Sequence, residues 1–406
     1  MSKIIAAPGL LKLAKRLAAL ISAACLALML LIVGPANASS TRWRLMPTPA
    51  NDNVTLNAVS CTSETQCVAV GYNYNHISGD STPAADLWKG AAWTAVTPPA
   101  DATQMLGVAC PAASYCIAVG YENTDNGLES TAQAWSWNGA AWSGMTVFNP
   151  GSILNGLTAI TCAGPSNCEA VGYHGVGFSY PLAEFWNGKT WANQSTSGTP
   201  PGSLSAVACI TTSKCEAVGS NYYTGQALAL RLNGSKWVSQ AMPALPPPSL
   251  EGQPDESGLG GISCYAAGCT AVGWQGDDGD ITDNLAEVYN GTRWALQSPV
   301  GSGDGTLWYS QWDAVHCVSA ANCTAIGYTS ENNDFGGDYY THLTLAGTWN
   351  GTAWTVDTTP DPGSTVDEGT YDVLDGLSCT SAICTAVGNN AFNGGNHSTA
   401  SLAIRN

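Results

Sequence analysis

Oxygen-bearing side chains crowd one short stretch of the sequence, residues 277–284, which reads DDGDITDN. Asp277, Asp278, Asp280 and Asp283 lie close to a glycine, and Ca²⁺ takes roughly six to eight oxygen ligands of this kind. The EF-hand pattern is not met, because no bidentate glutamate stands at its twelfth position. The stretch predicts a calcium site of another geometry. The alternative is a solvated acidic surface that keeps an exported protein soluble.

Acid–base chemistry has its own candidates in Asp278, Asp338 and His342. A pair of carboxylates, such as Asp278 with Asp338 or Glu331, is what glycosidases use, and a histidine can serve as a base. The sequence contains no serine or cysteine nucleophile motif, metalloprotease helix or phosphate-binding loop. We therefore expect a binding protein without catalysis, and we keep an extracellular glycoside hydrolase or lyase as the alternative.

Aromatic side chains recur beside asparagine and aspartate, a combination that makes binding surfaces for a glycan or a protein. Several follow directly after an A-V-G or A-I-G triplet, where the alternative role is to plug the local structure. The candidate ligand-binding residues are Tyr72, Tyr121, Tyr173, Tyr223, Trp274, Tyr328, Tyr339 and Tyr340.

These residues belong to a repeat that is clearest at residues 105–145. There LGVAC and CIAVGY are two apolar runs joined by a polar turn, which predicts a tight hairpin. AQAWSW, the dipeptide Asn138-Gly139 and AWSGMTV predict a second hairpin that turns at Asn-Gly. Each repeat is therefore expected to hold four antiparallel strands, which we call a to d in chain order.

Paired cysteines mark the repeats, and each pair is followed by A-V-G or A-I-G. A period near fifty residues with four strands per period predicts an all-β, seven-bladed β-propeller. Zinc is disfavoured because no second cysteine pair combines with histidines at finger spacing. We expect one disulfide per blade, in the pairs Cys61–Cys67, Cys110–Cys116, Cys162–Cys168, Cys209–Cys215, Cys264–Cys269, Cys317–Cys323 and Cys379–Cys384.

The two ends of the chain resemble complementary parts of one repeat. The final residues, ASLAIRN, match strand c of the other repeats and lack a strand d after them. Residues 42–50, RWRLMPTPA, match strand d and lack a strand c before them. Because an open solenoid would need polar caps instead, we expect the N-terminal strand to complete the last blade and close the ring.

Residues 1–38 have the pattern of a secretory signal. Four basic residues precede an apolar run at 17–33, and Ala36-Asn37-Ala38 forms a small-residue cleavage site. The alternative is an uncleaved membrane anchor. With cleavage after Ala38, residues 39–406 form a single secreted propeller domain, and no later segment is apolar enough to span a bilayer.

The chain is strongly acidic, with 30 Asp and Glu against 13 Lys and Arg and a net charge of −17. Such a surface repels nucleic acid and anionic membranes, and it favours cations, cationic partners or neutral ligands. Nineteen of the acidic residues lie between Glu251 and Asp375, where Arg293 is the one basic residue, so the field is concentrated on the later repeats. We expect a monomer that binds neither nucleic acid nor, once the signal is cleaved, a membrane.

The expected ligand face carries the b/c and d/a loops, because these vary in length and sequence while the a/b and c/d turns are short and uniform. The innermost strand positions are expected to be Ala, Val, Ser and Gly in every blade. His316 is the main exception, and we expect it to be a packed histidine without a catalytic role.

The turn W-N-G-x-x-W, as at 349–354, resembles that of secreted actinobacterial-type propellers whose activities are largely unassigned. The blade length is similar to that of kelch repeats. A fainter likeness to the sialidase Asp-box rests on G-x-x-W alone, at Gly351 to Trp354. Sialidases also need three converging arginines. The arginines beyond the signal lie in or beside strands c and d, away from the axis, so we do not expect sialidase activity. They are Arg42, Arg44, Arg231, Arg293 and Arg405.

Overall fold

The computed structural model describes residues 43–49, 53–75, 78–124, 128–245, 255–277, 281–297, 307–332, 340–362, 370–381, 383–392 and 398–406. One compact unit spans Arg42–Asn406. The signal predicted at residues 1–38 lies outside the described residues, so its cleavage stays a prediction.

Every regular element among the described residues is a β-strand, and the strands group by the predicted cysteine repeats. Repeat 1 has β2 (Val54–Ser63), β3 (Gln66–Tyr74), β4 (Ser81–Trp88) and β5 (Trp93–Ala95). Repeat 2 has β6 (Gln104–Ala112), β7 (Tyr115–Thr124), β8 (Glu129–Trp137) and β9 (Trp142–Met145). Repeat 3 has β10 (Leu154–Gly164), β11 (Asn167–Val176), β12 (Phe178–Trp186) and β13 (Trp191–Asn193).

The later repeats follow the same order. Repeat 4 has β14 (Gly202–Thr211), β15 (Lys214–Asn221), β16 (Ala227–Asn233) and β17 (Lys236–Ser239). Repeat 5 has β18 (Asp255–Tyr265), β19 (Gly268–Asp277), β20 (Ile281–Tyr289) and β21 (Trp294–Leu296). Repeat 6 has β22 (Leu307–Ser319), β23 (Asn322–Asn332), β24 (Tyr340–Trp349) and β25 (Trp354–Asp357). Repeat 7 has β26 (Thr370–Cys379), β27 (Cys384–Phe392) and β28 (Ser398–Arg405), and β1 (Arg44–Leu45) pairs with β28.

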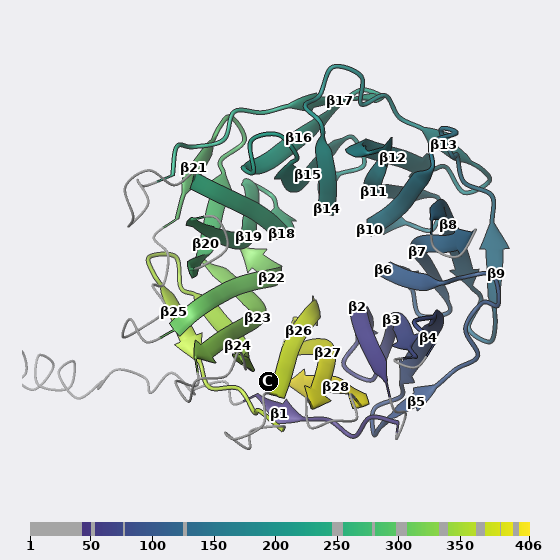
Figure 1. Cartoon of the computed structure of the whole chain (residues 1–406), viewed down its shortest axis with the longest axis vertical. Helices are drawn as coiled ribbons and strands as arrows, with labels where there is room; N and C mark the ends of the chain where they lie inside the picture. The colour runs from purple at the N-terminus through teal and green to yellow at the C-terminus, as the bar shows by residue number, and fades with distance from the viewer. Residues whose placement is uncertain are drawn as a thin grey trace, which may run out of the picture. The chain divides into compact units, whose positions relative to one another are not determined.

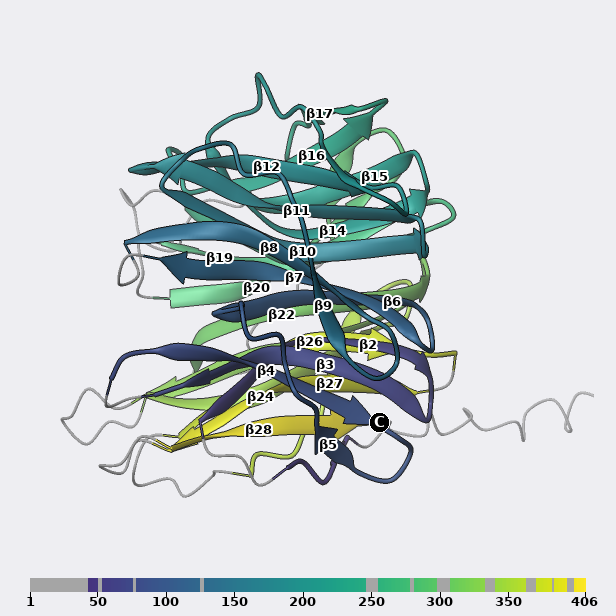
Figure 2. The same ribbon diagram turned by 90° about the vertical axis from the view of Figure 1, so that its right-hand side faces the viewer.

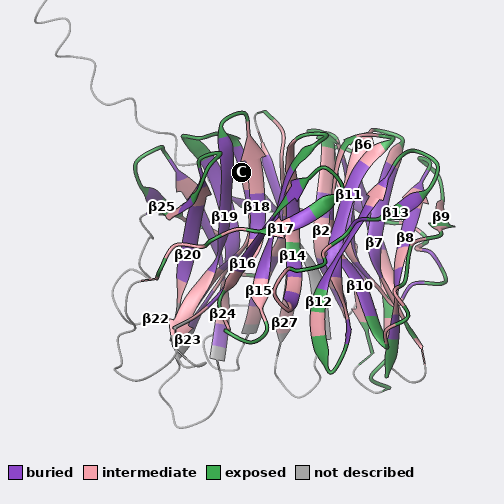
Figure 3. Ribbon diagram, turned by 90° about the horizontal axis from the view of Figure 1, so that it is seen from above, coloured by how far each residue is buried: buried purple, intermediate pink, exposed green. Residues whose placement is uncertain are grey.

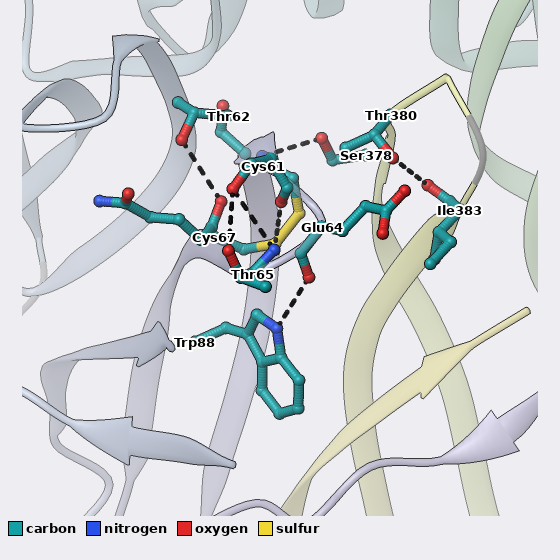
Figure 4. Close-up of a disulfide and its surroundings, with 12 residues drawn as sticks. Cys61, Thr62, Glu64, Thr65, Cys67, Trp88, Ser378, Thr380 and Ile383 are labelled. Atoms are coloured by element: carbon teal, nitrogen blue, oxygen red, sulfur yellow. Dashed lines mark hydrogen bonds between the residues drawn. A yellow bond between two sulfur atoms is a disulfide. The ribbon is translucent and has the colours of Figure 1, made fainter. Parts of the chain in front are cut away.

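The a/b hairpin of each repeat carries a disulfide, and all seven predicted cysteine pairs are bonded. In repeat 1, Cys61 and Cys67 face each other across β2 and β3 with their Cα atoms 4.0 Å apart. The indole nitrogen of Trp88 donates to the carbonyl oxygen of Glu64 in the same turn, at 3.1 Å (Figure 4). The disulfides and the strand c tryptophan therefore stabilise the a/b turn, which is the structural role expected of them.

The glycine of each A-V-G triplet lies where strand a carries a β-bulge. An added Cβ at Gly172 would come within 2.0 Å of the carbonyl oxygen of Gly156, and one at Gly327 within 2.1 Å of that of Gln311. No side chain fits at such a distance, so the close approach of the two backbones requires glycine. The bulges themselves recur in strand a of neighbouring repeats, for example between Leu157 and Ala159.

The c/d hairpins of repeats 2 to 6 turn at Asn-Gly, as the sequence predicts, and that of repeat 1 turns at Lys89-Gly90. Gly139 has a φ of 91°, a left-handed conformation that glycine adopts without strain. The side chain of Asn138 accepts hydrogen bonds from the backbone N–H groups of Ala140 and Ala141, at 3.0 and 2.9 Å. This turn chemistry joins strands c and d without using the side chains of the flanking tryptophans.

The hydrophobic core lies between neighbouring repeats. One cluster joins Val70 and Leu87 of repeat 1 to Met105 and Trp135 of repeat 2, and Met105 and Trp135 have no exposed surface. The aromatic pairs that flank the c/d turns contact each other, as Trp88 and Trp93 do at 5.9 Å between ring centroids. The tryptophans are therefore core residues, as expected, and repeats are stabilised by burial against their neighbours.

The repeats follow one another around a common centre, with strands a innermost (Figure 1). Repeats 7 and 1 are joined as other neighbours are. The backbone N–H of Cys61 donates to the hydroxyl of Ser378 at 2.9 Å, just as that of Cys110 donates to Ser60 and that of Cys317 to Ser263. β1, which precedes repeat 1 in the chain, pairs with β28 of repeat 7, and side chains of repeats 1 and 7 share one hydrophobic cluster.

The strands of successive repeats lie in layers when the unit is viewed from the side (Figure 2). Their central residues are buried, and exposed residues gather at the turns (Figure 3). Single parallel contacts also join neighbouring repeats, such as Thr282 with Tyr309 and His342 with Tyr371. Within the part of the chain that is described, no helix has the length and apolar character needed to cross a membrane.

Candidate functional site

The bulge position of strand a, four residues before the first cysteine of each pair, differs from repeat to repeat. In repeat 1 the side chain amide of Asn57 donates to the carbonyl oxygen of Met105 in repeat 2, at 2.9 Å. In repeat 3 the hydroxyl of Thr158 lies 2.5 Å from the carbonyl oxygen of Leu204 in repeat 4. In these two repeats the side chain at the bulge position therefore contacts the next repeat. Its occupants in order are Asn57, Leu106, Thr158, Ser205, Gly260, Asp313 and Asp375.

Repeats 6 and 7 place carboxyl groups, Asp313 and Asp375, at this position. The side chain amide of Gln311 donates to Oδ1 of Asp313 at 2.6 Å, while Oδ2 of Asp313 is buried with no partner among the described residues. Burial raises the pKa of Asp375 to about 7. Burial, followed by the charge of Asp375, raises the pKa of Asp313 well above its ordinary value. The two groups therefore hold protons that an exposed aspartate would lose.

A cavity of about 130 Å³ lies beside Asp313, at the inner strands of repeats 4, 5 and 6. Its polar lining is Ser205, Ser220, Gln311 and Asp313, and its aromatic wall includes Trp274. The indole nitrogen of Trp274 lies against Gly258, where an added Cβ would come within 2.8 Å. A glycine in β18 is thus what allows this orientation of the indole.

Three aromatic rings pack together between repeats 6 and 7. Tyr328 stacks on His342 with ring centroids 4.7 Å apart and planes at 19°, and His342 contacts Tyr371 at 4.5 Å. Burial, together with the charges of Asp313 and Asp375, raises the pKa of Tyr328 to about 12. Tyr328 is therefore a neutral hydrogen-bonding group beside the two carboxyls. We name Trp274, Gln311, Asp313, Tyr328 and Asp375 the axial site.

His342, predicted as a weak catalytic candidate, lies inside this stack. Burial lowers the pKa of its imidazole to about 4, so the ring is neutral at physiological pH. Its Nδ1 is buried and has no hydrogen-bond partner among the described residues. The geometry makes His342 a packing partner of Tyr328, and any proton transfer from it would require the stack to open.

The predicted ligand-binding tyrosines separate into groups. Tyr72, Tyr121 and Tyr173 are half-buried and close enough that burial, followed by Tyr173 and Tyr72, raises the pKa of Tyr121 to about 12. Tyr173 also lies against Gly156, where an added Cβ would be 2.9 Å from its ring. This grouping matches the alternative in which the tyrosine after A-V-G plugs the repeat, whereas Trp274 and Tyr328 join the axial site.

Tyr223 lies elsewhere, in an exposed aromatic patch at repeats 3 and 4. It contacts Phe178 at 5.5 Å and Tyr222 at 5.8 Å, and it is 62% exposed. Phe178 and Tyr222, which the sequence reasoning did not single out, are also exposed. Tyr340 begins β24, and Tyr339 lies outside the described residues, so their contribution to a site stays a prediction.

The predicted calcium and carboxylate candidates are mostly outside the described residues. Asp277 ends β19 and Asp283 lies in β20, while Asp278, Asp280 and Asp338 are not described. Among the residues that are, no three His, Cys, Asp or Glu side chains are grouped so that they could hold a metal ion. Calcium at this stretch therefore remains a prediction.

The expectation of small residues at every innermost position is wrong at the bulge position, which Asn57, Leu106 and Thr158 occupy in repeats 1 to 3 and acids occupy in repeats 6 and 7. Asp313 and Asp375 stand there, because a β-bulge directs one additional side chain toward the next repeat. The signal was present in the sequence. Aligning the repeats on their cysteines shows an acid four residues before the pair in these two repeats and in none of the others. His316 is half-buried, and burial lowers the pKa of its imidazole, while the absence of a catalytic role stays a prediction.

The axial site offers a limited set of interactions. It combines a large aromatic face, an amide, hydroxyl groups and a carboxyl oxygen that lacks a partner, and it carries no basic side chain among its residues. Ligand sites commonly pair aromatic walls with a few convergent polar groups. The arrangement can therefore accept hydrogen bonds from hydroxyl or amide groups of a neutral ligand, or from a cation.

No protein family model and no curated protein matches the sequence. Solved structures do match in shape. A structure of YCF48 bound to D1 peptide is 10% identical, with 91% of this chain and 96% of that chain covered and a TM-score of 0.50. YCF48 from Cyanidioschyzon merolae is 11% identical, with 90% and 98% covered and a TM-score of 0.50. A six-bladed fucose-recognising lectin from Aleuria aurantia is 11% identical, with 78% and 100% covered and a TM-score of 0.43. The similarity to YCF48, a β-propeller, supports a β-propeller fold for this chain.

Proposed function

We propose that residues 39–406 form a secreted, closed, seven-bladed β-propeller that binds a glycan or a protein segment at the axial site without transforming it. The bond from Cys61 to Ser378 and the pairing of β1 with β28 support closure of the ring. The seven disulfides suit an oxidising compartment outside the cell. The sequence pattern at residues 1–38 supports export.

The observation that carries the binding proposal is Oδ2 of Asp313, a buried polar atom without a partner among the described residues. Burying a polar atom without a hydrogen bond costs about 1–3 kcal/mol, so a fold gains nothing by leaving it so. A ligand hydroxyl or amide group in the adjoining cavity would supply the missing partner, because such a group can accept a hydrogen bond from a protonated carboxyl or donate one to a carboxylate. Trp274 would then contact the apolar face of the same ligand.

The small volume of the cavity favours a group that projects from a larger ligand. A space of about 130 Å³ accommodates part of a sugar ring or one side chain, while the rest would lie over the face of the b/c and d/a loops. In the solved complex, YCF48 has the D1 peptide bound. A β-propeller with this overall similarity can thus present a peptide-binding surface, and the negative charge of the present chain favours neutral or cationic segments.

Arrays of glycans and peptides probed with residues 39–406 test the proposal. We expect retained, chemically unchanged ligands whose binding falls at least about tenfold with Trp274→Ala, because aromatic anchors dominate such contacts. Thr158→Ser is the matched control, since it keeps the hydroxyl of repeat 3 and lies away from the cavity lining. Equal binding by Trp274→Ala and by the wild type would contradict the proposal that the ligand binds at the axial site.

A glycoside hydrolase or lyase is the second candidate, favoured by the interaction between Asp313 and Asp375. Two carboxyl groups whose ionisation is linked can divide the acid and base roles in glycosidic bond cleavage. The same arrays distinguish this activity, because released product supports the enzyme and retained ligand supports the binding module.

We keep calcium as a separate proposal for the stretch from Asp277 to Asp283. Calcium titration followed by the melting temperature tests it, with Asp280→Ala as the variant. An unchanged melting temperature of the wild type at millimolar calcium would contradict the proposal.

A further inference from the structure

Another buried carboxyl group, Glu287, lies at a pocket that shares no lining residue with the cavity beside Asp313. Glu287 is in β20, strand c of repeat 5, opposite Ala271 of β19 and Leu296 of β21. Its side chain is 1% exposed. The pocket has a volume of about 450 Å³ and is lined by repeats 4 and 5.

Glu287 differs in its hydrogen bonds from Glu184 and Glu169, which are also buried. Glu184, at the same position in repeat 3, accepts a hydrogen bond from the backbone N–H of Phe148 at 3.0 Å. Glu169 accepts one from the side chain amide of Gln194 at 3.2 Å. Both carboxyl oxygens of Glu287, in contrast, are buried without a partner among the described residues. Glu287 thus retains its full capacity to accept hydrogen bonds.

Two polar side chains that line the pocket with Glu287 accept hydrogen bonds from other groups. The hydroxyl of Ser257 accepts a hydrogen bond from the backbone N–H of Ala227 at 2.9 Å, and Oε1 of Gln240 accepts one from the indole of Trp294 at 2.8 Å. Glu287 is also the one titratable side chain among the described residues that line the pocket. No described group donates a hydrogen bond to Glu287, so a partner for it would come from solvent or from a ligand.

Part of the pocket lining is apolar. Leu228, Met242 and Leu245 line it, and Met242 and Leu245 pack against the hydrophobic cluster between repeats 4 and 5. An apolar stem would gain from burial against these three side chains. The remaining lining includes the polar side chains of Asn221 and Gln226.

We propose that this pocket binds a primary ammonium group carried on an apolar stem, as in a lysine side chain, with the ammonium on Glu287 and the stem on Leu228, Met242 and Leu245. An ammonium group supplies three donors, and Glu287 offers two acceptor oxygens. Pairing the two charges removes the cost of burying either one alone. The net charge of −17 attracts cations to the protein as a whole.

Binding would displace a proton. Burial raises the pKa of Glu287 to about 8, so the empty site holds a protonated carboxyl at neutral pH. An incoming ammonium ion forms an ion pair with the carboxylate, and the carboxyl proton passes to the buffer. The site is independent of the axial site, so failure of either proposal leaves the other standing.

Calorimetric titration of residues 39–406 with n-hexylammonium tests the proposal, with n-hexanol as a neutral probe of similar size. We expect n-hexylammonium to bind the wild type with proton release at pH 7 and n-hexanol to bind at least about tenfold more weakly, as loss of a charged hydrogen bond implies. Glu287→Gln should weaken n-hexylammonium binding by a similar factor. Glu184→Gln, the matched change in repeat 3, should leave it unaltered.

A second variant keeps the test decisive if Glu287→Gln folds poorly. Ala244 is exposed and lines the pocket, so Ala244→Trp fills its mouth without disturbing the core. We expect this variant to lose n-hexylammonium binding. No binding to the wild type, equal binding of n-hexanol, or unaltered binding to Ala244→Trp would each overturn the proposal.

Discussion

The inner strands of repeats 1 and 3 and those of repeats 6 and 7 share one backbone geometry but carry different chemistry at the β-bulge. Asn57 and Thr158 use the bulge to donate hydrogen bonds to the next repeat. Asp313 has a buried oxygen that makes no such bond within the described residues, and Asp375 holds its proton to a pH of about 7. Neighbouring repeats can thus be joined at this position without acids.

This difference separates stability from function within one repeated structure. In repeats 1 and 3 the bulge residue stabilises the contact between neighbours. In repeats 6 and 7 the same position carries carboxyl groups that are costly to bury, and Asp313 borders a cavity. Unfavourable buried groups of this kind are typical of functional sites.

The largest expected effect tests the feature that both regions share. Gly172→Ala in repeat 3 and Gly327→Ala in repeat 6 each place a Cβ about 2 Å from a carbonyl oxygen of strand a, at 2.0 and 2.1 Å. We expect each to lower the free energy of unfolding by about 3 kcal/mol, because the backbones must separate. Denaturant unfolding with disulfides intact measures this. A large loss in one repeat and none in the other would show that the two regions do not share the same geometry.

The next effect should have opposite signs in the two regions. Thr158→Val removes a hydroxyl donor from the carbonyl oxygen of Leu204, and we expect it to lower the free energy of unfolding by about 1–2 kcal/mol. Asp313→Asn replaces a costly acid with a group that can donate as Asn57 does. We expect it to be neutral or to stabilise by up to about 1 kcal/mol at pH 8. Destabilisation by both variants would show that Asp313, like Thr158, stabilises the fold, and would contradict the contrast between the two regions.

The pH dependence of stability should follow the acids. The pKa of Asp375 is about 7 in the folded protein, above its ordinary value of 3.8, so the folded state holds a proton that the unfolded chain releases. This contribution to stability is present below pH 4 and is lost as the pH rises toward 7. Glu169, with its pKa raised by burial to about 8, acts in the same direction.

We therefore expect the free energy of unfolding to fall between about pH 4 and pH 8, and to fall less steeply in Asp375→Asn. Thr158→Ser should keep the slope of the wild type. A stability that rises across this range would contradict the assignment of raised pKa values to the buried acids.

The smallest effect concerns the ring stack beside the acids. Because burial lowers the pKa of His342 to about 4, its neutral form contributes stability above pH 6.5 that is lost as the pH falls toward 4. His342→Phe keeps a flat ring between Tyr328 and Tyr371, and it should leave stability at pH 7 within about 0.5 kcal/mol of the wild type. Imidazole signals in NMR spectra provide the check, and titration of His342 near pH 6.5 would show that the stack is open.

The strand order, the disulfides and the Asn-Gly turns could be predicted from the sequence because each rests on local chemistry. Cysteine spacing, alternating small residues and a glycine after asparagine act over a few residues. The approach of Asp313 to Asp375 could not be predicted in this way. It depends on how repeats 6 and 7 are placed, and on a bulge that changes which side chain turns inward.

The ligand residues show the same division. Trp274 and Tyr328 were predicted as ligand-binding residues from the aromatic pattern. The structure places Trp274 at the cavity beside Asp313 and Tyr328 near both acids, and ligand binding by either residue stays a prediction. Gln311 and Glu287 were missed, because a polar residue within a strand acquires meaning only from its neighbours across a repeat boundary. The position of Glu287 two residues before the strand c aromatic, shared with Asp86 and Glu184, is the one sequence signal that pointed to it.

The most direct test of the axial site measures binding and stability on one variant, Asp313→Asn. Calorimetric titration with the strongest ligand from the arrays would be compared with denaturant unfolding under the same conditions. We predict that affinity falls at least about tenfold while stability is kept or increased, since the lost group serves the ligand and not the fold. Unaltered affinity, or a fall in affinity that accompanies loss of stability, would contradict the account.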